Sequence, residues 1–353
     1  MVRTVWCCCA LLMIAACSPR GFMQHAAPAE SASVRSVWVA NFRSTQPAPE
    51  DQTAPPRPDQ MTFQHHDISI PEGHQLGHIE WPKGPADATT DFVTLQTQDH
   101  PSLKAWAADV AASDTENTKE TLLYVHGYNV THGEAVYQLA QLGHDFEIQT
   151  PVVAFSWPSA GVAAGYVYDR DSAFYARDQL EQVILALTRG SNRKLVILGH
   201  SMGNLMIMEA LRQIEISGKL DINTSIEALF MVSPDIDGEL FHAQASRLKS
   251  LPDPWVIVAA KQDRALRLSA ILTGKTNRLG SATDRSAVRD LPISVIDVSE
   301  LANGGFNHSV ALTSPAAISI LKNLTGEIGQ LAPVVVLNNT DVRAGGRLAV
   351  APN

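Results

Sequence analysis

The chain has 353 residues, of which 45% are hydrophobic and 18% are charged. This length and composition suit a globular protein with a sizeable core, and they exclude a chain that is disordered throughout or collagen-like. Asp and Glu outnumber Lys and Arg by 36 to 27, and the formal net charge of −9 argues against a nucleic-acid partner. The sequence has no apolar run of about 18 residues or more, so it predicts no membrane-spanning helix.

The first 17 residues are typical of a targeting segment. Arg3 precedes an apolar stretch over 5–16 that is too short to span a bilayer. All four cysteines of the chain lie in this segment: Cys7, Cys8, Cys9 and Cys17. The sequence Ile14-Ala15-Ala16-Cys17 resembles the cleavage site of bacterial lipoproteins, in which the cysteine becomes the first residue and carries fatty acyl chains such as palmitate. We therefore expect a lipoprotein signal peptide over 1–16 and lipidation at Cys17, with an ordinary signal peptide as the alternative.

Cleavage before Cys17 has consequences for chemistry and location. The mature chain would hold no other cysteine, so it would have no internal disulfide, cysteine nucleophile or thiolate zinc site in its core. Ser18 follows Cys17, and by resemblance to lipoprotein sorting this residue, rather than Asp, suggests the outer membrane. We expect a protein of the cell envelope that is attached to a membrane through its N-terminal lipid, on the periplasmic side if the organism is Gram-negative.

Composition divides the rest of the chain into three parts. Residues 17–60 are rich in Ser, Ala, Pro and Gln, which indicates a flexible tether, although 34–42 could instead add an edge strand. A folded domain is expected over 61–330, followed by a C-terminal tail over 331–353. Near the start of the domain, two Ile-containing segments at 68–70 and 79–81 predict a hairpin.

Short apolar runs and helix-compatible stretches alternate along the domain. The runs, typical of strands that are buried on both faces of a parallel sheet, are 122–125, 152–155, 195–198, 229–232, 255–259 and 293–296. The helix-compatible stretches are 134–146, 170–189, 204–216 and 236–249. This alternation predicts an α/β fold with a mostly parallel sheet flanked by helices. In such sheets ligands bind beyond the carboxyl ends of the strands, so functional residues should follow the runs directly.

A candidate nucleophile follows the run at 195–198. The sequence Gly199-His200-Ser201-Met202-Gly203 matches Gly-x-Ser-x-Gly, in which a sharp strand-to-helix turn exposes a serine hydroxyl. The pentapeptide alone is weak evidence, but its position between a buried strand and a helix makes it specific. We predict that Ser201 is a catalytic nucleophile, with a structural turn serine as the alternative.

A serine hydroxyl needs a base, and in this type of sheet the order along the chain is Ser, acid, His. Only two histidines follow Ser201: His242, in a polar-faced helical stretch, and His308, in a loop after the last apolar run. His308 is therefore the predicted base. Asp263 follows the run at 255–259 and is the predicted acid, which would fix the imidazole tautomer. The competing acids are Asp235, Asp237 and Asp297.

The negative charge that develops on a substrate oxygen needs backbone N–H donors. We expect one donor at Met202, at the start of the helix after the serine. The other is expected in the loop after 122–125, from Tyr128 or, as second choice, Asn129. His126 precedes this loop, and we expect it to make a structural hydrogen bond.

Together these motifs resemble the α/β-hydrolase superfamily and, more narrowly, a bacterial family of uncharacterised α/β hydrolases known as a domain of unknown function. The blocks that carry the resemblance are 126–130, 155–159, 166–170, 199–204, 233–237 and 263–266, within a match over about 61–324. The resemblance implies a triad of Ser201, Asp263 and His308. The family usually has Gly before the base histidine, whereas this chain has Asn307.

We therefore expect an α/β-hydrolase that cleaves carboxylic esters, from small-molecule or lipid substrates, through an acyl-enzyme intermediate and without a cofactor. An amidase, peptidase or acyltransferase would use the same triad, and a non-catalytic envelope scaffold or binding lipoprotein is the alternative from another class. The basic tract 265–289 is expected to be solvated surface, with a lid as the alternative. Four histidines lie among Gly and Pro residues that do not fix ligand geometry, so we expect no metal site there. They are His65, His66, His74 and His78.

Overall fold

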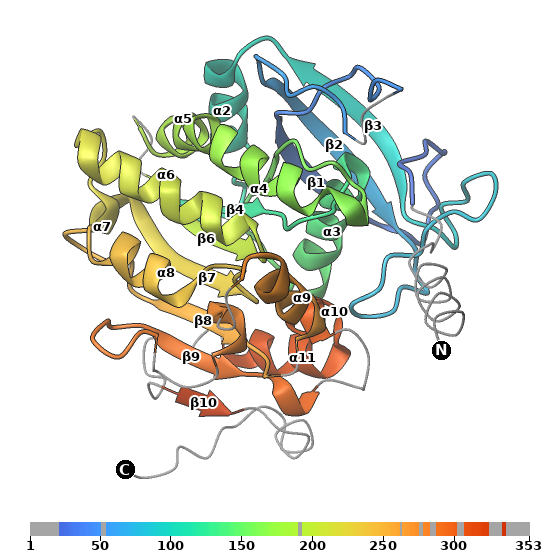
Figure 1. The fold of residues 1–353 in the computed structure, drawn as a ribbon. Helices are drawn as coiled ribbons and strands as arrows, with labels where there is room; N and C mark the ends of the chain where they lie inside the picture. Colours follow the sequence, from blue (N-terminus) through green and yellow to red (C-terminus); the bar gives the residue numbers. More distant parts are fainter. Residues whose placement is uncertain are drawn as a thin grey trace.

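The computed structural model describes residues 21–50, 54–189, 193–261, 263–274, 278–282, 287–301, 307–324 and 334–336. These residues form a ten-stranded sheet in the order β10-β9-β8-β7-β6-β4-β5-β1-β2-β3, with helices on both faces (Figure 1). Neighbouring strands are parallel from β10 to β1, whereas β1, β2 and β3 pair antiparallel at one edge. The predicted α/β fold with a mostly parallel sheet is confirmed.

The strands are β1 (Ser33–Asn41), β2 (Thr62–Ile70), β3 (Val93–His100), β4 (Glu120–Val125), β5 (Val152–Ser156), β6 (Lys194–His200), β7 (Ile226–Val232), β8 (Trp255–Ala259), β9 (Ser294–Asp297) and β10 (Val334–Val336). The α-helices are α2 (Leu103–Ala112), α3 (His132–Asp145), α4 (Tyr166–Tyr175), α5 (Arg177–Thr188), α6 (Gly203–Ser217), α7 (Ile222–Ser225), α8 (Gly238–Ala245), α9 (Arg264–Leu272), α10 (Val310–Thr313) and α11 (Pro315–Leu324). Short 3-10 turns are η1 (Ala163–Gly165), η2 (Leu279–Ser281), η3 (Ser299–Leu301) and η4 (Asn307–Ser309). Within the described ranges, every helix is too short or too polar to cross a membrane.

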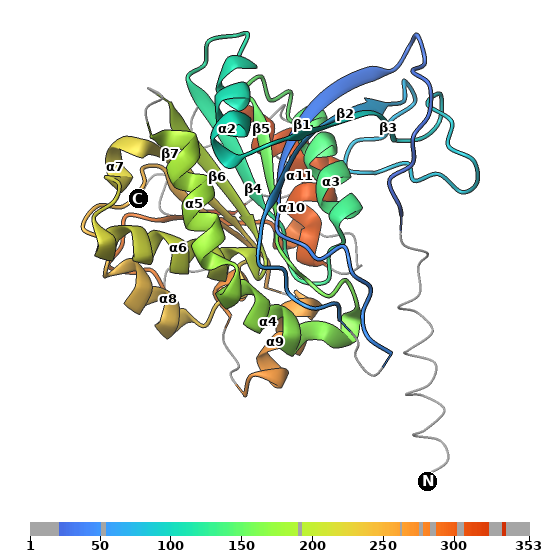
Figure 2. The ribbon, with the colours of Figure 1, turned by 90° about the horizontal axis from the view of Figure 1, so that it is seen from above.

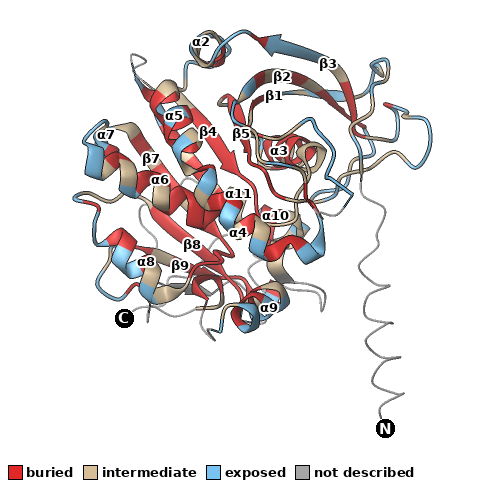
Figure 3. Cartoon of the chain, turned by 45° about the horizontal axis from the view of Figure 1, so that its top comes forward, coloured by how far each residue is buried: buried red, intermediate tan, exposed pale blue. Residues whose placement is uncertain are grey.

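Apolar side chains cover both faces of the sheet and make two cores. One core lies between the sheet and α2, α4, α5, α6 and α8, and the other between the sheet and α3, α10 and α11 (Figure 2). The central strands are the most buried part of the chain (Figure 3). This burial on both faces is the reason that each predicted apolar run is a strand.

The boundaries that were expected from composition differ from the structure. Strand β1 lies within the expected tether and occupies a position between β5 and β2, so it is neither a tether nor an edge strand. Its residues 37–40 are all buried, and this apolar content outweighs the Pro- and Ser-rich surroundings. Strand β10 lies in the expected tail and pairs with β9. The targeting segment, including Cys17, lies outside the described residues.

The predicted hairpin between 68–70 and 79–81 is wrong. Strand β2 pairs instead with β3, and 79–81 is not a strand. Trp81 stacks on Tyr137 of α3, with ring centroids 4.9 Å apart, so its apolar surface is buried by a helix. The long segment between β2 and β3 therefore folds over α3.

The parallel strands place the sequence motifs at one edge of the sheet. β4, β6, β7 and β8 are neighbours that run in the same direction, so the loops after their carboxyl ends lie close together. We call this edge the carboxyl edge. It carries Gly127, Ser201, Asp235 and Asp263, each just after a strand.

Candidate active site

Ser201 occupies the sharp turn between β6 and α6. Its φ of 53° lies in the left-handed region, which is costly for a residue with a side chain. The turn is held by backbone hydrogen bonds: the Ser201 N–H donates to the Val232 carbonyl over 3.0 Å, and the Asp235 N–H donates to the Ser201 carbonyl over 3.2 Å. A Cβ at Gly203 would lie 2.5 Å from the carbonyl oxygen of His126, so only glycine fits there. The arrangement is that of the predicted strand-to-helix elbow.

His308 and Asp263 come together although 45 residues separate them. The Nδ1 atom of His308 lies 2.7 Å from Oδ2 of Asp263. Asp263 is fully buried, and its other oxygen accepts a hydrogen bond from the Leu266 N–H over 3.0 Å, which caps α9. The carboxylate is therefore fixed from two sides, and it holds the Nδ1 proton of the imidazole so that Nε2 is the nitrogen able to accept a proton.

His308 lies over the turn that carries Ser201. Its ring packs against that of His200, the residue before Ser201, with centroids 4.9 Å apart. His200 Nε2 also donates to the His308 carbonyl over 3.3 Å. Burial, reinforced by the neighbouring His308, lowers the pKa of His200 to about 3, so His200 is neutral. Asn307, which replaces the usual glycine, begins η4, and this backbone still brings His308 to Asp263.

The competing acids are engaged elsewhere. Asp235 accepts hydrogen bonds from Tyr166 over 2.9 Å and from Ser269 over 2.5 Å, and it forms an ion pair with Arg278. Asp237 caps α8, and Asp297 accepts a hydrogen bond from the Ser299 N–H. We expected the basic tract 265–289 to be solvated surface. Arg278, which belongs to this tract, is instead buried.

The loop after β4 lies against the Ser201 turn. A Cβ built at Gly127 would lie 2.9 Å from the Cβ of Ser201 and 3.0 Å from Nδ1 of His200. The N–H of Asn129 donates to Asp169 over 2.9 Å. This N–H, the second choice for binding the oxyanion after that of Tyr128, therefore already has an acceptor. Met202 immediately precedes α6, where the positive end of the helix dipole favours developing negative charge.

His126 has the predicted structural role. It is fully buried and stacks on Trp157, with ring centroids 4.9 Å apart. Its Nδ1 donates to the Gly127 carbonyl over 2.8 Å. Burial, together with the nearby charge of Arg43, lowers the pKa of His126 well below its usual range, so the ring is neutral.

Two residues that the sequence analysis missed hold this loop in place. Arg43, just after β1, donates to the Ser159 and Val130 carbonyls over 2.9 and 2.7 Å, and lies 3.0 Å from Nε2 of His126. The carboxylate of Asp169, in α4, accepts from the N–H of Asn129, from Ser159 Oγ over 2.6 Å and from the Ala160 N–H. Asp169 could have been found, because it lies in the block 166–170 that carries the family resemblance. Arg43 could not, because it lies in the segment 17–60 that was expected to be a flexible tether.

Three groups with metal-ligating atoms come close together at another place. His74, His144 and Asp145 each offer one ligand atom within 4.8 Å of the others. Both ring nitrogens of His74 are already used, because Nδ1 lies 2.8 Å from Glu80 and Nε2 lies 2.8 Å from Asp145. Burial opposes the charge on His74, but these two carboxylates raise its pKa to about 9. The cluster is thus an imidazolium held by two carboxylates.

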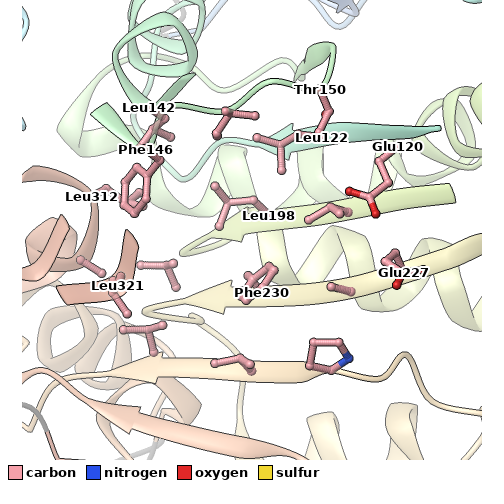
Figure 4. A pocket seen from close by; sticks show the side chains of 18 of the residues that line it. Glu120, Leu122, Leu142, Phe146, Thr150, Leu198, Glu227, Phe230, Leu312 and Leu321 are labelled. Atoms are coloured by element: carbon pink, nitrogen blue, oxygen red, sulfur yellow. The ribbon is translucent and has the colours of Figure 1, made fainter. Parts of the chain in front are cut away.

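A cavity of about 530 Å³ lies on the face of the sheet that α3, α10 and α11 cover (Figure 4). Apolar side chains from β4, β6, β7 and the helices line it, among them Leu122, Leu198 and Phe230. Glu120 and Glu227 lie at one end of the cavity, near the amino ends of β4 and β7. The cavity therefore extends along the sheet away from the carboxyl edge.

Comparison with solved structures gives distant similarities. Aspergillus fumigatus lipase B is 16% identical, with a TM-score of 0.41, over 67% of this chain and 58% of the lipase. Dienelactone hydrolase from Anabaena variabilis is 10% identical, with a TM-score of 0.40, over 76% of this chain and 91% of that chain. Esterase B from Lactobacillus rhamnosis, inhibited by a tributyrin phosphonate, is 11% identical, with a TM-score of 0.40, over 98% and 97%. This chain thus spans less than two thirds of the lipase, and the comparison with curated proteins gave no match.

A family model gives the assignment. The model described as "Alpha/beta hydrolase of unknown function (DUF900)" matches residues 102–326. The match includes the strands from β4 to β9 and the residues Ser201, Asp263 and His308. It begins after β3, so the antiparallel edge of the sheet lies before it. Since the match covers more than half of the chain, this protein belongs to the DUF900 family of alpha/beta hydrolases.

Proposed function

We propose that this protein is a serine hydrolase that cleaves carboxylic esters, with Ser201 as nucleophile, His308 as base and Asp263 as acid. The observation that carries the proposal is the 2.7 Å contact between His308 Nδ1 and Asp263 Oδ2 beside the strained Ser201 turn. A scaffold protein would need neither the buried carboxylate on the imidazole nor the serine at a positive φ. Both features have a reason if the serine hydroxyl has to be deprotonated.

The proposed reaction has two steps. In the first, Ser201 Oγ attacks the carbonyl carbon of the ester while His308 Nε2 takes the hydroxyl proton. His308 then gives this proton to the leaving alcohol as the ester C–O bond breaks, and an acyl-enzyme remains. In the second, a water molecule loses its proton to His308 and attacks the acyl carbon, and Ser201 recovers the proton as the carboxylic acid leaves. The N–H groups of Met202 and Tyr128 would bind the oxyanion.

Labelling with a fluorophosphonate, which reacts with activated serines, tests the proposal. We expect the wild type to be labelled and Ser201→Ala not to be. Asp263→Asn keeps an oxygen that can cap α9 but loses the charge, so labelling should slow by about 10³–10⁴-fold without unfolding. Asp237→Asn makes the same change at the cap of α8 and should label like the wild type. A wild type that stays unlabelled, under conditions that label a known esterase, would favour the scaffold.

The choice of scissile bond needs a separate measurement. Hydrolysis of p-nitrophenyl esters, with little hydrolysis of matched p-nitroanilides, would support the ester over the amide. A series of acyl chain lengths would then show whether the substrates are small-molecule or lipid esters. Faster turnover of the anilides would assign the protein as an amidase, and product capture by an added alcohol would assign it as an acyltransferase.

We further propose that the mature chain begins at lipidated Cys17 and is held at the envelope membrane, at the outer membrane if the organism is Gram-negative. The support is the sequence Ile14-Ala15-Ala16-Cys17, which resembles a lipoprotein cleavage site. Cys17→Ser should abolish the incorporation of labelled palmitate into the protein. Palmitate labelling that persists in that variant would contradict lipidation at Cys17.

A further inference from the structure

Helix α9 turns apolar side chains toward solvent. Its inner side is formed by Leu266, Ser269 and Ala270, which are buried. On its outer side Leu268 is 57% exposed, Ile271 77% and Leu272 55%. A surface helix normally places polar residues on its outer side, so this orientation needs a cause outside the described fold.

A second apolar group lies beside α9. Val162, before η1, is 39% exposed and Val167, in α4, is 69% exposed. The hydroxyl of Tyr166 lies 2.7 Å from that of Ser269, which joins α4 to α9, and Figures 1 and 2 both show the two helices side by side. We call the five exposed residues the apolar rim: Val162, Val167, Leu268, Ile271 and Leu272.

The apolar rim borders the candidate active site. Helix α9 begins directly after Asp263, whose carboxylate both caps the helix and contacts His308. A surface that contacts the rim would therefore lie next to the catalytic residues.

The charge on α9 favours a negatively charged partner. The helix sequence Arg-Ala-Leu-Arg-Leu-Ser-Ala-Ile-Leu contains two arginines and no acidic residue, although the whole chain has a net charge of −9. Both Arg264 and Arg267 are exposed. A helix that exposes large apolar residues flanked by arginines has the composition of helices that lie in the headgroup region of anionic bilayers.

The N-terminal segment reaches the domain at the first turn of α3, near the carboxyl edge, and continues to Thr94 at the start of β3. Met23 packs against Gly133 in the first turn of α3, just after the loop that follows β4, because a Cβ on that glycine would lie 3.0 Å from Met23 Cγ. Phe22 beside it is 73% exposed. Cys17 is six residues before Met23, so an extended link between them would span at most about 20 Å. A lipid on Cys17 would thus hold the first turn of α3, which lies near the carboxyl edge, close to the bilayer.

We propose that the apolar rim docks on the surface of an anionic phospholipid bilayer, with the carboxyl edge of the sheet facing the headgroups. The rim side chains enter the interface, and the arginines of α9 lie among the phosphates. The orientation rests in part on the proposed anchor at Cys17, but it does not depend on any hydrolytic activity. Ester groups of membrane lipids would then lie within reach of the Ser201 turn without leaving the bilayer.

An environment-sensitive fluorophore can report which face meets the lipid. We would use the full chain with serine at all four cysteine positions and a single new cysteine, Ile271→Cys in the rim or Ile216→Cys as the matched control. Ile216 is 52% exposed in the last turn of α6, at the opposite edge of the sheet. The vesicles are phosphatidylethanolamine with phosphatidylglycerol. We expect the emission at 271 to rise severalfold and shift to the blue, and the emission at 216 to stay unchanged.

The comparison between the two sites makes the test decisive. The N-terminal segment is the same in both proteins, so any attachment that it provides affects both probes equally. Equal responses at 271 and 216, or no response at 271, would overturn the proposal. A 271 probe that is already shielded without vesicles, in a protein that light scattering shows to be a dimer, would instead assign the rim to a second copy of this chain.

Charge and apolar contact can be separated by two further variants. In vesicle flotation, Arg267→Glu should weaken binding to anionic vesicles while the folded state, followed by circular dichroism, is unchanged. Ile271→Glu should weaken binding to all vesicles, whereas Ile216→Glu should not. If Arg267→Glu and Ile271→Glu both float with vesicles as Ile216→Glu does, the apolar rim does not contact lipid. Fluorophosphonate labelling plays no part in these readouts, so they remain valid if the proposed hydrolysis fails.

Discussion

Gly127 and Ser201 approach each other so closely that the loop after β4 and the Ser201 turn behave as one unit. Only a hydrogen atom on Gly127 fits against the Cβ of Ser201 and the ring of His200. The loop is also fixed from behind by Arg43 and Asp169. A side chain at Gly127 must therefore displace the serine rather than the loop.

We predict that Gly127→Ala lowers activity on the order of 10²-fold, because a displacement of about 1 Å of a catalytic group has an effect of this size. The added Cβ would lie 2.9 Å from the Ser201 Cβ. The check is kcat/KM with an ester that the wild type cleaves, together with the thermal midpoint. Gly84→Ala is the control, since no heavy atom lies within 4 Å of a Cβ there. Unchanged activity in Gly127→Ala would mean that the loop is free to move and does not form the site.

The catalytic candidates could be predicted from the sequence because each follows an apolar run, and their order along the chain is restricted. Asp263 could not be separated from Asp235 or Asp237 by sequence alone. Asp235 is excluded by its partners Tyr166, Ser269 and Arg278, which come from two segments remote from it in the chain. Such contacts depend on how helices pack on the sheet, and no local pattern contains that information.

At the scale of elements, the central strands could be predicted and the antiparallel edge could not. β4 to β9 are apolar because helices cover both of their faces. In β3, four consecutive residues, 96–99, are exposed, so the strand carries no apolar run to identify it. β1 is apolar, but its surroundings have the composition of a linker. These strands are defined by pairing with neighbours that are remote in the sequence.

Strand β1 contributes to the site through Arg43, which follows it. The guanidinium donates to Ser156 Oγ and to the carbonyls of Ser159 and Val130, and it lies against Nε2 of His126. This fork-shaped group connects the ends of β1, β4 and β5. A lysine carries the same charge as a single point and cannot reach all of these acceptors.

We predict that Arg43→Lys lowers both the free energy of unfolding, by about 1–3 kcal/mol for each acceptor left unsatisfied, and the activity. Arg193→Lys is the control, because the guanidinium of Arg193 also donates from all three of its nitrogens, to Asp114, Thr121 and Glu120 near the amino end of β4. The measurements are urea unfolding and kcat/KM. The control should lose stability but keep its activity. Equal losses of activity in both variants would show that Arg43 acts only on global stability.

At the scale of the whole molecule, the contacts of His74 with Glu80 and Asp145 hold the segment between β2 and β3 against helix α3. His74 binds Glu80 in its own segment and Asp145 at the end of α3. Asp145 also accepts a hydrogen bond from the Gly77 N–H over 2.7 Å and from Gln141 over 2.5 Å. Two parts of the chain, the segment between β2 and β3 and helix α3, therefore depend on one charged ring, whose side chain is only 4% exposed.

The charge on His74 gives the stability a dependence on pH. Its pKa in the folded protein is about 9, above the value near 6.5 of an unfolded histidine. The proton is thus bound more tightly in the folded state, and its stabilising contribution is fully present below about pH 6.5 and is lost as the pH rises through about 9. Burial opposes the charge on Glu80 and Asp145, but the bonds with His74 lower the pKa of both carboxyls, so they stay ionised at neutral pH.

We predict that His74→Gln destabilises the protein on the order of 3 kcal/mol at pH 6 and much less at pH 10, because the wild type itself loses the charged ring there. The measurement is urea unfolding of both proteins across this pH range. His78→Gln is the control, since His78 is exposed in the same segment. Its difference from the wild type should stay small at every pH. A difference between His74→Gln and the wild type that is constant from pH 6 to 10 would mean that the ring is neutral, and that it joins the segments only by ordinary hydrogen bonds.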